Sequence, residues 1–318
     1  MNRAIQTHTY TPAHPALPQA RRPKSAAAVL ARVIARVLAV VLAVWLTGSL
    51  TGCATVATEG GVPIDASHSA KGQDSRALFL VLHYTVADFP QSMKILTEQE
   101  VSAHYLLSDE PQPRIYRLVD ESRRAWHSGA SAWKENRRLN SSSIGIEIVH
   151  PGVQRGTSDK VAAELRQYEP WDQKQFEVLV PLIKDIVKRH GILPERILGH
   201  GEVSAQYKED PGPTFPWRQL ADLGITPPWP DAPRVATQRA LYEGLLASGE
   251  TAVPNARGVQ RALARHGYAI EPTGEFDKQT QRVLMNFQMR YRPANYLGLA
   301  DAETAALIWV LTNPVKAP

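Results

Sequence analysis

Two short, unbroken apolar runs in the first half of the chain are typical of buried strands. Residues 77–83 read Ala-Leu-Phe-Leu-Val-Leu-His, and residues 143–149 read Ser-Ile-Gly-Ile-Glu-Ile-Val. Runs of this length that are rich in branched apolar residues favour strands covered on both faces. The first run ends at His83, and the second contains Glu147 as its only charged residue. We therefore predict two buried strands, each with a polar side chain at or near its end.

Apolar positions with helical spacing follow these runs. We predict helices over residues 92–100 and 171–190, because apolar residues in the longer stretch recur every three or four positions. Gly191 directly follows that stretch and supplies a helix stop signal. Strands and helices are thus mixed in this part of the chain.

A proline-rich segment separates this region from a second one. Residues 225–234 contain four prolines, which cannot donate to helix or sheet hydrogen bonds, so we place a domain boundary there. Asp277 and Asp301 each precede a helical pattern and suit its N-cap. We predict one folded unit over residues 76–229 and a small all-α unit over residues 230–318. The helical patterns of the second unit cover residues 235–247, 258–266, 278–290 and 302–311.

The front of the chain has the features of a secretory leader. Residues 1–52 contain six basic residues and no acidic residue, and the apolar run at 37–46 is too short to span a bilayer, which takes about 20 residues. The sequence Leu-Thr-Gly-Cys that ends at Cys53 resembles the lipobox of bacterial lipoproteins. We predict a signal peptide over 1–52, lipid attachment at Cys53 and a flexible tether over 53–75. The alternatives for Cys53 are an inert buried thiol and a reactive nucleophile.

The resemblance to lipoproteins implies several acyl chains and hence durable anchoring, since one chain alone binds membranes only marginally. Ala54 follows Cys53, and the absence of Asp there is similar to lipoproteins that are sorted to the outer membrane of a Gram-negative host. We expect a protein that is lipid-anchored in the outer membrane and faces the periplasm. Because Cys53 is the only cysteine, the mature chain cannot form an internal disulfide.

The net charge of +5 does not indicate a nucleic-acid partner. Six of the bases lie in residues 1–52, which leaves 30 bases against 31 acids from Cys53 onward. Binding to phosphates would require surplus positive charge on the folded part of the chain. We therefore expect no nucleic-acid partner.

Two histidines and an aspartate stand out as candidate metal ligands. His83 closes the first strand, His200 lies in Leu-Gly-His-Gly-Glu, and Asp210 follows ten residues later. Two imidazoles and one carboxylate, with a fourth position left for water, are typical of a catalytic rather than a structural zinc site. Such a site activates water and polarises a carbonyl. No short ligand motif is present, however, and Asp210 before Pro211 could equally start a turn.

Several sequence blocks resemble those of the zinc-dependent N-acetylmuramoyl-L-alanine amidases, the amidase-2 family related to peptidoglycan recognition proteins and to phage T7 lysozyme. The resemblance covers nearly the whole segment from Arg76 to about Leu220. It implies an α/β fold with a central mixed sheet flanked by helices. The blocks are 82–85 (LHYT), 102–105 (SAHY), 125–129 (AWHSG), 143–147 (SIGIE), 199–200 (GH) and 208–212 (KEDPG).

The resemblance also implies a role for individual residues. It makes His83, His200 and Asp210 the ligands of one zinc ion per chain. Glu147 becomes the general base that takes a proton from water and later delivers it to the leaving amine. Lys208 becomes the group that stabilises the oxyanion. The alternatives are a strand-end carboxylate in a surface ion pair for Glu147 and a solvated loop lysine for Lys208.

Three further residues are candidates for contact with substrate: His127, Trp126 and Tyr84. A structural role for His127 is the alternative. His104 is expected to be a packed or supporting group, because the zinc already has three ligands.

The second unit resembles the small helical peptidoglycan-binding domain found beside many cell-wall hydrolases. The residues that carry this resemblance are Gly274, Phe276, Asp277, Thr280, Leu284 and Phe287. A second binding module raises the effective concentration of an enzyme at its polymer. We therefore expect peptidoglycan and muropeptides as partners, and a monomeric protein.

The predicted activity is hydrolysis of the amide between N-acetylmuramic acid, including its anhydro forms, and L-alanine. One alternative is a peptidoglycan-binding protein without activity, as in relatives of this fold that lack the metal ligands. Another is a zinc endopeptidase acting on the stem peptide, which shares the metal chemistry and differs in its products.

Overall fold

The computed structural model describes residues 55–57, 60–154, 166–249 and 254–314. The chain divides into two compact units, residues 1–73 and 74–318. In the first unit, β1 (Thr55–Ala57) pairs antiparallel with β2 (Pro63–Asp65). This pairing was not expected in a segment predicted to be a tether, and it is only three residues long on each strand. The predicted signal peptide and Cys53 lie outside the described residues.

The second unit is built on a five-stranded mixed sheet in the order β5-β4-β8-β3-β9. The two predicted strands form its centre as a parallel pair, with His83 directly opposite Glu147. Strand β4 joins β8 and strand β9 joins β3, both parallel, whereas β5 pairs antiparallel with β4. The strands are β3 (Phe79–Tyr84), β4 (Tyr105–Leu107), β5 (Ile115–Arg117), β8 (Ser143–Ile148) and β9 (Ile197–Gly199). A separate small sheet pairs β6 (Ala132–Trp133) with β7 (Asn136–Arg137).

Local capping explains where the helices beside the sheet begin and end. Helix α2 (Phe89–Glu98) starts three residues before its predicted position, because Asp88 accepts a hydrogen bond from the amide of Gln91 and Pro90 is tolerated in the first turn. Helix α3 (Gln173–His190) ends at the predicted position, since Gly191 adopts the left-handed conformation at φ 66°. The shorter helices are α4 (His200–Val203) and α5 (Trp217–Asp222), and two 3-10 turns cover Leu139–Ser141 and Pro194–Arg196.

The described residues of the C-terminal region form four helices: α6 (Ala232–Ala247), α7 (Ala256–His266), α8 (Lys278–Tyr291) and α9 (Ala302–Thr312). Asp277 and Asp301 cap α8 and α9, which confirms both predicted caps. Helix α6 begins three residues before the prediction, because Asp231 caps it and Pro233 fits the first turn instead of breaking the helix. The boundary predicted at residues 229 and 230 falls between α5 and α6. No helix among the described residues is long and apolar enough to cross a membrane.

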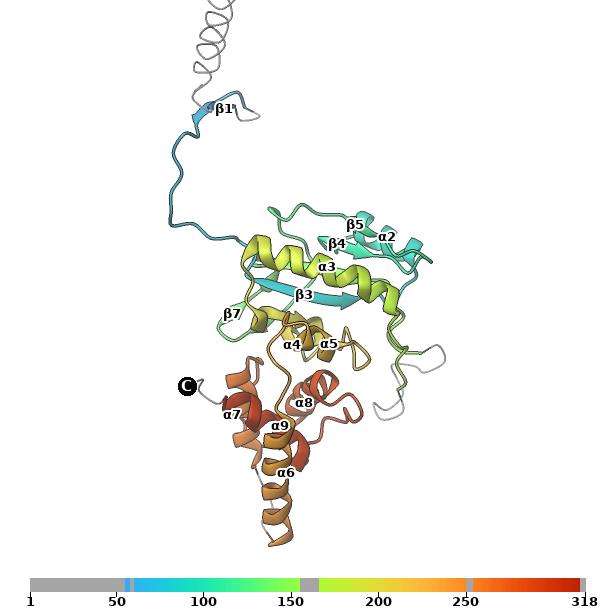
Figure 1. Ribbon diagram of the computed structural model, residues 1–318, viewed down its shortest axis with the longest axis vertical. Coiled ribbons are helices and arrows are strands. Elements are labelled where there is room, and N and C mark those ends of the chain that lie inside the picture. The colour runs from blue at the N-terminus through green and yellow to red at the C-terminus, as the bar shows by residue number, and fades with distance from the viewer. Residues whose placement is uncertain (1–54, 58–59, 155–165, 250–253, 315–318) are drawn as a thin grey trace, which may run out of the picture. The chain divides into compact units, whose positions relative to one another are not determined.

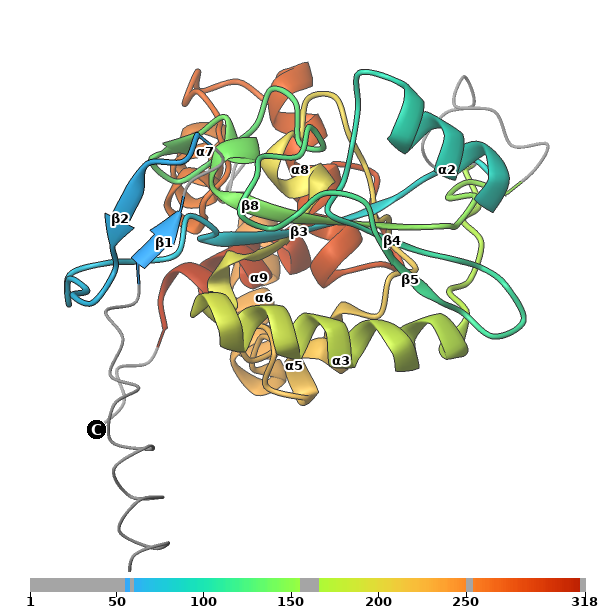
Figure 2. The same ribbon diagram turned by 90° about the horizontal axis from the view of Figure 1, so that it is seen from above.

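The two faces of the sheet bury different sets of helices, as expected from the two-residue period of a strand. Leu80 and Leu82 of β3 pack with α3 in one core. Phe79 and Val81 point to the other face and pack with residues of α7, α8 and α9, among them Phe287. Figure 1 shows α3 along one side of β3 and α6–α9 on the other, and Figure 2 shows α3 running along the sheet. Helices α7, α8 and α9 therefore pack directly on the sheet.

Candidate metal centre

Three buried side chains meet at one edge of the sheet. His83 lies in β3, His200 is the first residue of α4, directly after β9, and Asp210 lies in the loop that follows. The carboxyl ends of parallel strands meet at the same edge of a sheet, which brings the histidines together although 117 residues separate them. His83 Nδ1 is 3.0 Å from His200 Nδ1 and 3.1 Å from Asp210 Oδ2, and His200 Nδ1 is 3.2 Å from Asp210 Oδ2.

This triangle of donor atoms fits a tetrahedral metal ion. Ligand atoms at about 2.0–2.1 Å from zinc in tetrahedral geometry are separated by about 3.3 Å, close to all three observed distances. Burial and the neighbouring His200 lower the pKa of His83 to about 4, so its ring is neutral at neutral pH. Burial opposes ionisation of Asp210, but the two histidines outweigh it and lower the pKa of that carboxyl. Neutral imidazoles and an ionised carboxylate are the protonation states that a divalent metal requires.

A chain of hydrogen bonds directs His83 Nδ1 towards the centre. Ser143 Oγ donates to the carbonyl of Leu139 at 2.6 Å, and it therefore accepts from His127 Nε2 at 3.0 Å. His127 Nδ1 is then free of its proton and accepts from His83 Nε2 at 2.9 Å. The last link leaves Nδ1 of His83 unprotonated, as a metal ligand must be.

The same hydrogen bonds place His127 between Ser143 and His83. Its predicted role is contact with substrate, with a structural role as the alternative. The ring lines the cavity at the site, yet it is only 8% exposed and both its nitrogens bond to protein groups. It lies over Gly145, where a side chain would collide with it. His104, also buried, accepts a hydrogen bond from the Gly145 amide and so supports β8.

Glu147 and Lys208 lie beside the three donors. Glu147 Oε1 is 3.9 Å from His83 Nδ1, and Oε2 is buried with no hydrogen-bond partner in the described part of the chain. Burial and the charge of Asp210 raise the pKa of Glu147 well above its ordinary value, while Lys208 opposes the shift. Lys208 is exposed and lines the same cavity. A carboxyl with a raised pKa beside a metal site has the properties of a general acid and base.

A cavity of about 850 Å³ opens onto the site. Tyr84 and Trp126 both line it, and Trp126 is 49% exposed. Tyr207, which the sequence analysis did not select, also lines it and is 74% exposed. An aromatic residue in a loop gives no signal in the sequence that would distinguish it from an ordinary surface residue.

The groups that support the site were not predicted from the sequence. Ser143 and Gly145 share one face of β8 with Glu147. Their small size at alternate positions was the only sequence feature that could have predicted a side chain packed against this face of the strand. Glu209, next to Asp210, accepts hydrogen bonds from Arg166 and Tyr168. No local pattern predicts those partners, because they lie more than 40 residues away.

Comparison with known proteins identifies the class to which this fold and site belong. The Amidase_2 family model, described as N-acetylmuramoyl-L-alanine amidase, matches residues 73–213, and a peptidoglycan binding domain model matches residues 253–308. The N-acetylmuramoyl-L-alanine amidase AmiD of Escherichia coli (strain K12) is 40% identical over 257 residues, which are 79% of this chain and 88% of AmiD. The chain belongs to the N-acetylmuramoyl-L-alanine amidase family.

Solved structures agree with this assignment over most of the chain. The complex of E. coli AmiD with the substrate anhydro-N-acetylmuramic acid-L-Ala-D-gamma-Glu-L-Lys is similar with a TM-score of 0.66 and 38% identity, over 81% of this chain and 96% of that one. AmpDh3 from Pseudomonas aeruginosa in complex with anhydromuramic pentapeptide gives a TM-score of 0.67 and 33% identity, over 78% of this chain and 96% of that one. The predicted α/β fold, the predicted family and the resemblance of the C-terminal region to a peptidoglycan-binding domain are confirmed.

Proposed function

We propose that this protein is a zinc-dependent amidase that cleaves the bond between the lactyl group of N-acetylmuramic acid and L-alanine, including fragments with anhydro ends. The observation that carries the proposal is the triangle of His83, His200 and Asp210, of which His200 and Asp210 line one cavity together with Glu147. The anhydromuramic ligands named in the complexes of AmiD and AmpDh3 support the substrate class.

Zinc held by His83, His200 and Asp210 would supply an activated water and polarise the amide carbonyl. Glu147 accepts the proton of the attacking water and delivers it to the leaving amine, since its carboxylate lies beside the three donors and its Oε2 has no hydrogen-bond partner among the described residues. Lys208 places a positive charge in the cavity, where it stabilises the oxyanion of the tetrahedral intermediate.

The exposed rim of the cavity suits a sugar-peptide substrate. Trp126 and Tyr207 present aromatic rings to solvent, and Tyr84 lines the wall. Aromatic rings offer a large apolar area together with a polar atom, which suits a ligand that is partly apolar and partly hydroxylated. We assign contact with substrate to Trp126 and Tyr84, and we add Tyr207.

The test uses residues 54–318 with purified peptidoglycan and with anhydromuropeptides, in the presence and absence of a chelator, with products identified by mass spectrometry. We expect stem peptides that begin with L-alanine, loss of activity with chelator and recovery with zinc. Bound but uncut polymer would instead place the protein among non-catalytic peptidoglycan-binding proteins. Cleavage within the stem peptide would keep the metal and make the protein an endopeptidase.

We further propose that Cys53 carries the lipid anchor and that the monomeric protein faces the periplasm from the outer membrane. The basic and apolar leader before Cys53 and the residue Ala54 after it support this location. Metabolic labelling with an alkyne fatty acid tests it. The parent is expected to incorporate label and to sediment with outer membranes, and Cys53→Ser to do neither. Equal labelling of both proteins would refute the anchor.

A further inference from the structure

We propose that the C-terminal helical region holds the metal ligands in position, through a polar stripe on α8 formed by Arg282, Asn286 and Arg290. These residues are spaced by four positions and therefore lie on one face of the helix. They contact the two segments that carry His200 and Asp210. The inference rests on the metal centre proposed above and extends the role of this region beyond attachment to polymer.

Arg290 supports the segment that carries His200. Its Nη1 donates to Glu202 Oε2 at 2.6 Å, and both side chains are buried. The same Glu202 oxygen accepts from the amide of Gly199 at 2.8 Å, which fixes the first turn of the four-residue helix α4. Arg290 also donates to the carbonyl of Ile197 at 3.3 Å, at the start of β9. One guanidinium group thus joins the strand before His200 to the helix that His200 begins.

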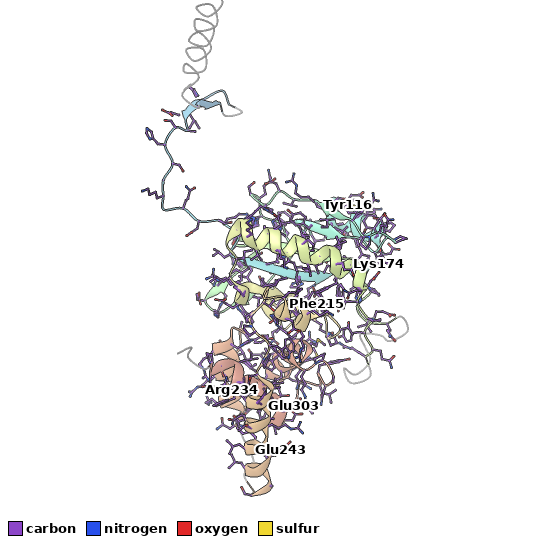
Figure 3. The ribbon with its side chains drawn as sticks, in the orientation of Figure 1. Tyr116, Lys174, Phe215, Arg234, Glu243 and Glu303 are labelled. Atoms are coloured by element: carbon purple, nitrogen blue, oxygen red, sulfur yellow. The ribbon has the colours of Figure 1, made fainter. Side chains whose placement is uncertain are left out.

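The guanidinium of Arg290 is itself held by packing. The guanidinium carbon Cζ of Arg290 lies 4.0 Å from the centre of the Trp217 ring in α5. Trp217 packs edge-on against Phe215, which is labelled in Figure 3 and follows Asp210 by five residues. The guanidinium of the ion pair therefore stacks on Trp217, which Phe215 supports from the loop that follows Asp210.

Arg282 supports the segment that carries Asp210. Its Nη1 is 2.9 Å from Glu209 Oε1, in the residue next to Asp210. Arg166 and Tyr168 bind the same carboxylate, so three donors from two regions of the chain fix Glu209. The loop that presents Asp210 is thus tied to α8.

Asn286, between the two arginines, brings its side chain close to the segment that follows His200. Its Nδ2 donates to the carbonyl of Ala205 at 3.2 Å. A Cβ atom at Gly201 would lie 2.1 Å from Asn286 Oδ1, so this approach requires glycine directly after His200. The amide of Gly201 also donates to the carbonyl of Asp210 at 2.7 Å, which joins the two ligand segments.

Asn286 and Arg290 are polar residues buried within the stripe, and their burial points to a positioning role beyond ordinary packing. Apolar neighbours on α8, Val283, Leu284 and Phe287, already supply a buried core with the sheet. Replacing a buried ion pair by apolar groups of similar volume is often neutral or stabilising, so stability alone does not explain the pair of Arg290 and Glu202. Its directional hydrogen bonds do fix the geometry of the metal-binding segments.

The experiment measures zinc affinity of metal-free full-length protein by competition with a chromophoric chelator. The test variants are Arg290→Met and Arg282→Met. The control is Arg292→Met, because Arg292 pairs with Asp301 and Glu303 inside the helical region. Circular dichroism reports folding, pelleting of the metal-free proteins with peptidoglycan reports polymer binding, and the visible spectrum of the cobalt-loaded proteins reports ligand geometry.

We expect zinc affinity to fall by about ten- to a hundred-fold in both test variants, the range found when groups that support metal ligands are changed. The visible spectrum of the cobalt-loaded test variants should differ from that of the parent, while their binding to peptidoglycan is retained. Arg292→Met should match the parent in all these measurements. Parent-like zinc affinity in Arg282→Met and in any folded Arg290→Met would overturn the inference, as would an equal loss in Arg292→Met. A parent that binds no zinc would refute the metal centre itself, and the inference with it.

Discussion

Replacing Gly145 with alanine tests the hydrogen-bond chain behind His83. Gly145 lies in β8 and has no left-handed φ, so alanine introduces no backbone strain. A Cβ at this position would lie 2.4 Å from His127 Cγ and 2.6 Å from His127 Cδ2 and Nδ1. Carbon atoms pack at about 3.5–4.0 Å, so the ring has to withdraw by about 1 Å.

That withdrawal breaks at least one bond of the chain. The bonds of His127 to His83 and Ser143 are 2.9 and 3.0 Å long, and an increase of about 1 Å takes either beyond hydrogen-bond distance. Overpacking costs about 1–3 kcal/mol, and a buried group left unpaired costs about 1–3 kcal/mol more. We therefore expect Gly145→Ala to lower the free energy of unfolding by about 2–5 kcal/mol and zinc affinity by about ten- to a hundred-fold.

Urea unfolding of the metal-free protein and zinc competition measure the two effects. Gly244→Ala is the matched control, because Gly244 is exposed in α6 and an added Cβ would have no atom within 4 Å. It should raise the free energy of unfolding by about 0.5–1 kcal/mol. If Gly145→Ala has the same free energy of unfolding and the same zinc affinity as the parent, His127 is not held over Gly145. Its hydrogen bond then does not set the tautomer of His83.

Three further predictions concern the site and the pH dependence of stability. Glu147→Ala should retain zinc and lose about 10²- to 10⁴-fold in turnover, and turnover at the parent rate would show that the general base is another group. His83→Ala should lose zinc in the chelator competition, and zinc binding as tight as in the parent would mean that the ligand set is wrong. Burial lowers the pKa of His266 from 6.5 to about 3, so the unfolded state binds more protons between these values and the free energy of unfolding falls as the pH decreases from about 6.5. His266→Phe, which preserves the contacts with neighbouring aromatic rings, should weaken this acid dependence in urea unfolding between pH 7 and pH 4, and identical curves would contradict the assignment.

Several elements could be located from the sequence to within a few residues. The apolar runs became β3 and β8, and the helical periods became α3 and α7–α9. Capping residues such as Asp277, Asp301 and Gly191 are local signals, because a cap bonds to residues at most a few positions away. The three-residue strands β4, β5 and β9 were not predicted, since they are too short for a periodic pattern.

The candidate site also has a part that the sequence predicted and a part that it did not. The sequence blocks singled out His83, His200, Asp210, Glu147 and Lys208 from their order and neighbours. Spacing along the chain could not determine that donor atoms 117 and 127 residues apart would lie within 3.2 Å of one another.

By itself, the sequence determined the two central strands, the longer helices and the set of candidate site residues, because these depend on local periodicity, capping and recognisable blocks. The tertiary structure alone decided that His127 supports His83 and that the polar stripe on α8 contacts the segments of His200 and Asp210. Both contacts depend on the packing of segments that are distant in the sequence. The side chain of His127 can approach Gly145, and that of Asn286 can approach Gly201, because glycine has no side chain.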